Sequence, residues 1–208
     1  MNKDSEIKDV KSRRVFDSRG NPTIEVDIIT KNNTLGRAMA PSGASTGSSE
    51  ALELRDKDDM YDGKDVKNAI NSINEELAPI LINKSCLNQE NFDFILNSFD
   101  QSVLKSKIGG NVSIALSLAN YICASRYMSK PLYEHCSINK KYTIPIPEIQ
   151  IFGGGAHAGN ISSFQDFLIF SPKKNDLLNF YQMTFNIFNT VKKELKKNNL
   201  LKGYSDEG

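Results

Sequence analysis

Residues 23–30 read Thr-Ile-Glu-Val-Asp-Ile-Ile-Thr, and apolar and polar side chains alternate along them. Positions 24, 26 and 28 form an apolar face and positions 23, 25 and 27 a polar one, which is the period of a half-buried β-strand. Residues 7–16 alternate less cleanly, Lys31-Asn32-Asn33 is a turn signal, and residues 35–40 can return as a third strand. Such short connections favour an antiparallel three-stranded meander.

The pattern becomes helical after residue 63. Apolar residues at helical spacing predict helices over 64–83, 89–100 and 111–128. Pro79 is expected to kink or end the first of them, and the third is apolar on most sides, which is typical of a buried helix. We therefore predict an α+β domain, a three-stranded meander plus helices, over residues 1–140.

Residues 141–208 have a different order of elements. Strands are predicted over 148–152 and 167–170, and a long amphipathic helix over 176–200. A strand–loop–strand–helix order is that of the opening of an α/β domain.

Composition excludes several classes of function. The net charge is +1, so no bulk field attracts nucleic acid or an anionic membrane. The polar N-terminus and the lack of a long apolar stretch predict a cytoplasmic protein. Cys86, Cys123 and Cys136 are interpreted as free thiols in a reducing compartment, and the two histidines, His135 and His157, lack the spacing for a zinc site.

The loop at residues 41–49 reads Pro-Ser-Gly-Ala-Ser-Thr-Gly-Ser-Ser. Its small residues allow a ligand to approach the backbone, and Ser45 and Thr46 supply hydroxyls, so a mobile loop here can close over an anion or a metal-bound substrate. From composition alone, an ordinary linker is the favoured alternative.

The run Gly153-Gly154-Gly155-Ala156-His157-Ala158-Gly159 places four glycines around one histidine. A tightly turned backbone can expose this imidazole at a strand end, where it can donate to phosphate or move a proton. The glycine density favours this function over a plain turn. The segment is not a P-loop, because no Gly-Lys-Ser/Thr follows.

Three further polar residues are candidates. Gln165 and Asp166 follow His157 closely, and Glu207 lies near the last residue. If Asp166 and Glu207 meet, one carboxylate can have a raised pKa and act as a proton donor. The sequence favours the alternative of two solvated acids at strand ends. Residues 17–22 and His135 are interpreted as structural.

Taken together, in this order and spacing, the segments resemble enolase. The resemblance spans residues 7–208 and is strongest in the two loop motifs. The matching segments are residues 17–23, 41–56, 61–64, 109–118, 131–133, 145–159, 165–167 and 206–208.

Enolases are phosphopyruvate hydratases that interconvert 2-phosphoglycerate and phosphoenolpyruvate with two magnesium ions. The resemblance implies an N-terminal capping domain over residues 1–140 and the incomplete start of a TIM-like α/β barrel over residues 141–208. It also implies a small-molecule substrate, no nucleic-acid or membrane partner, and a homodimer or higher homo-oligomer at full length. Metal ions suit this chemistry because proton removal beside a carboxylate creates a highly charged enolate.

The resemblance also implies roles for single residues. Ser45 matches the loop serine that closes onto the second magnesium, and His157 matches the histidine that approaches the substrate. Glu207 matches the acid that assists departure of the hydroxyl. Gln165 and Asp166 stand where the family has Gln-Glu beside the substrate.

The chain departs from the family in sequence and in length. Asp166 replaces a glutamate, which sets its carboxylate back by roughly 1.5 Å, and Ser49 replaces a histidine. Enolases are about twice as long, and the ligands of the first magnesium, the lysine base and the phosphate-binding arginine lie beyond residue 208. A partial barrel would have open edges and an uncovered apolar face. We therefore expect the chain alone to be inactive.

Two alternatives remain. A non-catalytic remnant or binding protein can keep the capping fold. Another acid-sugar dehydratase of the wider superfamily is disfavoured, because the loop at residues 42–47 fits enolase specifically.

Overall fold

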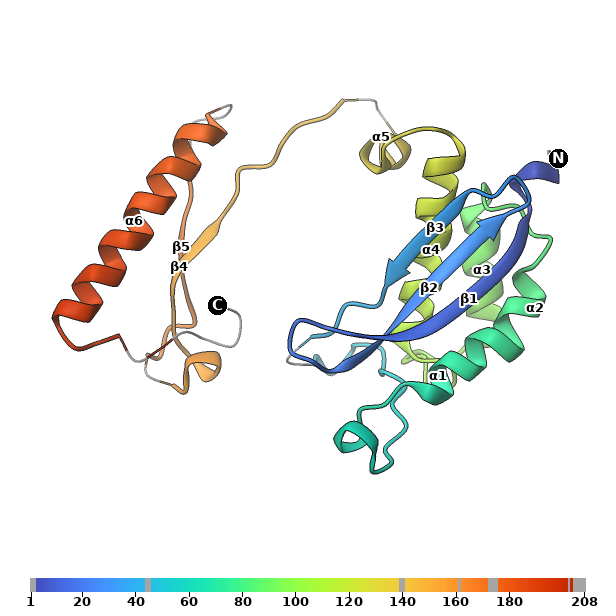
Figure 1. Ribbon diagram of the computed structural model, residues 1–208, viewed down its shortest axis with the longest axis horizontal. Coiled ribbons are helices and arrows are strands. Elements are labelled where there is room, and N and C mark those ends of the chain that lie inside the picture. The colour runs from blue at the N-terminus through green and yellow to red at the C-terminus, as the bar shows by residue number, and fades with distance from the viewer. Residues whose placement is uncertain are drawn as a thin grey trace. The chain divides into compact units, whose positions relative to one another are not determined.

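The computed structural model describes residues 3–43, 46–138, 141–160, 162–171, 176–201 and 203. The chain divides into two compact units, Met1–Lys141 and Tyr142–Gly208, and each is described by itself (Figure 1). Within the described ranges no helix is long and apolar enough to cross a membrane.

The first unit is built on an antiparallel sheet. It contains β1 (Ile7–Phe16), β2 (Pro22–Thr30) and β3 (Leu35–Met39) in the order β1-β2-β3. The turn after β1 closes through Asp17, whose carboxylate accepts from the backbone N–H groups of Arg19 and Asn21 at 2.9 and 2.8 Å. The predicted meander is therefore confirmed, and residues 17–21 form the turn between its first two strands.

The first predicted helix is interrupted. It runs as α1 (Lys67–Asn71), a π-helical segment (Ser72–Leu77) and α2 (Ala78–Leu81). Pro79 has no N–H to donate, so the wider turns just before it are a local adjustment to the proline. The helix begins at Lys67, later than predicted, because the Asp56 carboxylate caps the backbone N–H groups of Lys67 and Asn68 at 2.9 and 3.0 Å.

The remaining helices of this unit match the prediction closely. α3 (Gln89–Phe99) is capped by the Asn88 side chain, and α4 (Gly110–Tyr127) is the buried helix. A short helix that the sequence pattern missed, α5 (Leu132–Cys136), follows; His135 packs there against the Tyr121 ring, with ring centroids 4.7 Å apart.

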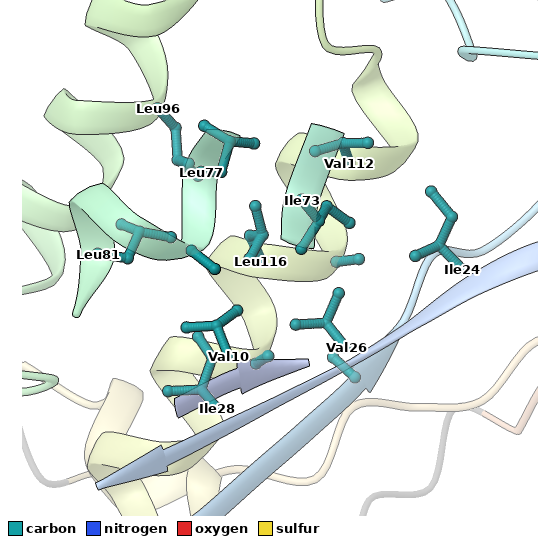
Figure 2. Packing of buried hydrophobic residues seen from close by; sticks show 14 of the residues in the cluster. Val10, Ile24, Val26, Ile28, Ile73, Leu77, Leu81, Leu96, Val112 and Leu116 are labelled. Atoms are coloured by element: carbon teal, nitrogen blue, oxygen red, sulfur yellow. The ribbon is translucent and has the colours of Figure 1, made fainter. Parts of the chain in front are cut away.

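The hydrophobic core lies between the sheet and these helices. Ile24, Val26 and Ile28, the apolar face of β2, are fully buried. Figure 2 shows them pointing towards α4, with Leu116 of that helix among them. Cys86 and Cys123 are buried free thiols in the same core, and Cys136 is an exposed free thiol.

The other face of the sheet carries a charged cluster. Asp27 is only 5% exposed, although its position on the polar face of β2 predicts contact with water. Arg37 of β3 donates to its two oxygens at 2.6 and 2.8 Å, and Arg13 of β1 donates to it from the other side. Hydrogen bonds from Arg37, and then from Arg13, outweigh the effect of burial and lower the pKa of Asp27 to about 2.

We expect Asp27→Asn to lower the free energy of unfolding by about 2 kcal/mol at neutral pH. The pKa of Asp27 is lower in the folded state, so its contribution is present above pH 3.8 and is lost as the pH falls to about 2. Urea unfolding at pH 7 and pH 2 measures this. The control is Asp9→Asn, which breaks only the exposed Asp9–Lys11 pair and should change stability by less than ~0.5 kcal/mol. Equal effects of both variants at pH 7 would contradict the prediction.

The second unit contains two strands and a helix. β4 (Ile149–Gly153) and β5 (Asp166–Ile169) pair antiparallel, with Ile149 opposite Ile169 and Gly153 opposite Asp166. α6 (Leu177–Lys197) packs along β4. Large apolar side chains remain exposed, among them Phe164, Phe170, Leu178 and Phe185.

Candidate functional site

The glycine-rich run forms a tight turn at the end of β4. The Gly154 N–H donates to the Gln165 carbonyl at 2.7 Å, and the Gly155 N–H donates to the Ser162 carbonyl at 2.9 Å. The Asn160 N–H returns to the Gly155 carbonyl at 2.7 Å. These bonds hold the backbone before and after His157 together, so the turn and the start of β5 form one local structure.

The close approach requires glycine at position 154. A Cβ atom there would lie 2.2 Å from the Phe164 carbonyl oxygen and 2.7 Å from the Ser162 Cβ. Gly154 is buried between these segments. The glycine density that marked this run in the sequence therefore has a packing cause as well as a conformational one.

The structure brings three of the five predicted site residues into this turn. Gln165 bonds Gly154 through its backbone, Asp166 lies opposite Gly153 at the start of β5, and both are exposed. His157 lies in the 3₁₀ turn Ala156–Ala158, for which the backbone is described. Ser45 and Glu207 lie outside the described residues. Their roles, and a meeting of Asp166 with Glu207, stay predictions.

Magnesium prefers a cluster of oxygen ligands, and such ligands are mostly carboxylates. In the parts of the chain that the structure describes, no three His, Cys, Asp or Glu side chains lie close enough together to hold a metal ion. Gln165 and Asp166, side by side at the start of β5, supply only two side chains with oxygen atoms. The described residues therefore do not form a magnesium site by themselves.

The first unit holds the two ends of the loop motif at residues 41–47. On the incoming side, the Ala40 N–H donates to the Ile24 carbonyl at 2.9 Å, and the Thr23 hydroxyl donates to the Ala40 carbonyl at 2.8 Å. On the outgoing side, the Glu50 carboxylate accepts from the Gly47 N–H at 2.9 Å. Thr46 and Ser49 are exposed.

Two residues that support this region were missed by sequence reasoning. Arg55 donates to the Pro22 and Lys64 carbonyls at 2.5 and 2.7 Å, which ties the chain after the loop to the start of β2. Asn111 is only 6% exposed, at the start of α4. Its signal was an amide beside the first apolar positions of a buried helix, where a polar side chain needs a partner.

A groove of about 460 Å³ lies elsewhere, along α6. Side chains of that single helix line it, from Asn179 to Val191, and none of them is an acid, a base or a thiol. Its lining therefore offers no ionisable group for proton transfer.

Comparison with known proteins agrees with this arrangement. Residues 7–136 match the family model of the enolase N-terminal domain, and residues 141–208 match that of the enolase C-terminal TIM barrel domain. Enolase 1 of Desulfitobacterium hafniense (strain Y51) is 42% identical over 202 residues, which are 97% of this chain and 46% of that protein. The enolase of Legionella pneumophila (strain Lens) is 42% identical over 203 residues, 97% of this chain and 48% of that protein.

The chain thus spans about half the length of the curated relatives it matches. Its three-stranded antiparallel sheet and helices agree with the first family model, and its strand–strand–helix unit is a partial TIM barrel domain. With nearly its whole length matched, the chain belongs to the enolase family.

Proposed function

We propose that this chain is the front half of an enolase-type lyase, which converts 2-phosphoglycerate into phosphoenolpyruvate and water in glycolysis. The observation that carries the proposal is the turn between β4 and β5, which joins the His157 segment to Gln165 and Asp166 through paired backbone hydrogen bonds. A single local structure that contains the segment around His157 together with an amide and a carboxylate residue suits binding of a phosphorylated hydroxy acid.

The proposed roles follow the family. His157, Gln165 and Asp166 bind the substrate, Glu207 assists departure of the hydroxyl, and Ser45 meets the second magnesium. The described residues form no metal cluster, so the main magnesium ligands would come from the part of the family fold that these 208 residues do not span. The chain alone is then inactive, and the full-length form would be a cytoplasmic homodimer or higher oligomer.

The test is fragment complementation. Formation of phosphoenolpyruvate is followed with the chain alone and with the chain mixed with the back half of the Legionella enolase, each with and without magnesium. We expect turnover only in the mixture with magnesium. The matched control is the front half of the Legionella enolase with the same back half.

Each other outcome is informative. Turnover by the chain alone would overturn the proposed inactivity of the 208 residues. A silent mixture beside an active Legionella control would overturn the catalytic assignment and favour the non-catalytic remnant.

We expect Asp166→Glu to raise kcat/KM in the complemented enzyme by up to about a hundredfold, because the longer side chain moves the carboxylate forward by roughly 1.5 Å. Asp166 is exposed at the start of β5, so the extra methylene meets no packed core. Steady-state kinetics on both chains measures the effect. The control is Asp9→Glu, a conservative change on β1 that should leave kcat/KM unaltered. An unchanged or lower value for Asp166→Glu would show that the aspartate is not a handicap.

A further inference from the structure

The segment Ala51–Leu54 follows the loop motif and lies against the start of α4. The Leu52 N–H donates to the Leu104 carbonyl at 2.8 Å, and the Leu52 carbonyl accepts from the Gly110 N–H at 2.7 Å. Two residues later, the backbone groups of Leu54 form hydrogen bonds with a side chain and not with another backbone. Its N–H donates to Asn111 Oδ1 at 3.0 Å, and its carbonyl accepts from Asn111 Nδ2 at 3.2 Å.

Leu52 and Leu54 thus each donate and accept one hydrogen bond, as alternate residues do along the edge strand of a sheet. Backbone groups are the partners of Leu52, and the Asn111 carboxamide takes the place of a backbone for Leu54. Asn111 is 6% exposed, and both of its bonds to Leu54 are partly buried. Packing is equally close at this point. A Cβ atom on Gly109, whose φ is +85°, would lie 2.7 Å from the Leu54 Cβ, and one on Gly110 would lie 2.8 Å from the Ala51 Cβ.

We propose that Asn111 is a positioning residue for the loop at residues 41–49. It acts through the clamp, meaning the segment Ala51–Leu54, and sets where the chain returns from the loop motif. The inference rests on the proposed function for its catalytic consequence, but the clamp itself can be tested on the 208-residue chain.

The loop has a fixed point on either side. Ala40 is held on β2 by Ile24 and Thr23, and the clamp is held on α4 by Asn111. Ala44 and Ser45 lie outside the described residues, whereas Ala40 before them and the clamp after them both lie within the described residues. Within the described ranges Asn111 is the only hydrogen-bond partner of the Leu54 N–H and carbonyl, so loss of the carboxamide leaves two backbone groups unpaired.

Asn120 offers a matched control on the same helix. It is fully buried, and its Nδ2 donates to the Cys86 carbonyl at 3.1 Å and to Gln89 Oε1 at 2.8 Å. Asn120→Leu therefore removes a comparable pair of buried bonds from α4 without touching the clamp. Any effect that both variants share reports general loss of stability.

The experiment compares Asn111→Leu with Asn120→Leu in the 208-residue chain. Amide exchange is measured at Leu52, Leu54 and Gly110, and a glutamate-specific protease reports cleavage after Glu50 and Glu53 relative to Glu76. We expect Asn111→Leu to speed amide exchange at Leu54, and cleavage after Glu50 relative to Glu76, by about tenfold or more. Asn120→Leu should leave the exchange rate at Leu54 and this relative cleavage unchanged. Asn111→Ala, which leaves space for water, serves if leucine prevents folding.

The catalytic arm uses the complemented enzyme. At matched loss of stability, Asn111→Leu should raise KM for 2-phosphoglycerate severalfold more than Asn120→Leu does. Unchanged exchange and cleavage in both Asn111 variants would overturn the clamp whatever the activity. A loosened clamp with unaltered KM and kcat would overturn the positioning role. A loosened clamp beside an inactive unsubstituted mixture would leave the clamp standing and refute the proposed function instead.

Discussion

Gly36→Ala is expected to destabilise the first unit by at least about 3 kcal/mol. Gly36 lies in β3 where α4 crosses the sheet, and a Cβ atom there would lie 2.2 Å from the Ala119 carbonyl oxygen and 2.5 Å from the Cys123 Cβ. The first obstacle is helix backbone, which cannot rotate away as a side chain can. The helix must therefore move off the sheet and loosen the contacts of Leu116 and Val26 in the core (Figure 2).

Such a loss is a large fraction of the 5–15 kcal/mol that stabilises a typical domain. Urea unfolding followed by circular dichroism measures it in the 208-residue chain. The control is Gly47→Ala, because a Cβ atom at Gly47 meets nothing within 4 Å. A Gly36→Ala variant within about 1 kcal/mol of the unsubstituted chain would show that α4 and β3 do not approach this closely.

Gly154→Ala is expected to break the candidate site. The added Cβ would lie 2.2 Å from the Phe164 carbonyl oxygen, so the backbone must separate and lose the Gly154–Gln165 and Gly155–Ser162 hydrogen bonds. Gln165 and Asp166 then shift relative to the His157 segment. A displacement of about 1 Å can cost a hundredfold in rate, and we expect at least that loss of kcat in the complemented enzyme.

Amide exchange at Gly154 and Gly155 gives a readout that does not depend on activity. We expect exchange there to rise at least about tenfold, the effect of losing one or two buried hydrogen bonds. Gly159→Ala is the control: its φ of +65° adds backbone strain of about 1 kcal/mol, but a Cβ atom meets nothing within 4 Å. If Gly159→Ala harms the site as much as Gly154→Ala does, strain of the turn and not its close packing is the cause.

Much of the fold could be predicted because its signals are local. The alternation over residues 23–30 and the helical spacing over 89–100 and 111–128 are each local patterns of a single element, and the structure contains all three elements. The interruption of the first helix was predictable only in part. Pro79 marked it, but the choice of a π-helical segment over a kink depends on how the helix packs on the sheet.

Less of the candidate site could be predicted. The glycine-rich run and the following Gln165 and Asp166 stand out in sequence, but their joining depends on the antiparallel pairing of β4 with β5 and on the backbone hydrogen bonds beside it. Ser45 and Glu207 were candidates by residue type and position, but their specific roles came from the family resemblance alone. Arg55 and Asn111 lie in segments that match the family, but the sequence did not show their roles, because each acts by bonding a backbone far away in the chain.

The sequence by itself determined the strands, the longer helices and the family, because periodicity and loop motifs are properties of neighbouring residues. Only the tertiary structure decided that Asp27 on a polar face is buried between two arginines, that Gly36 meets the backbone of α4, and that Asn111 holds Leu54. The physical reason is the same in each case. A buried polar group needs a hydrogen-bonding partner, and a glycine is required where another backbone approaches closely. In both situations the neighbouring group comes from a segment distant along the chain, so only the packing of the folded protein identifies it.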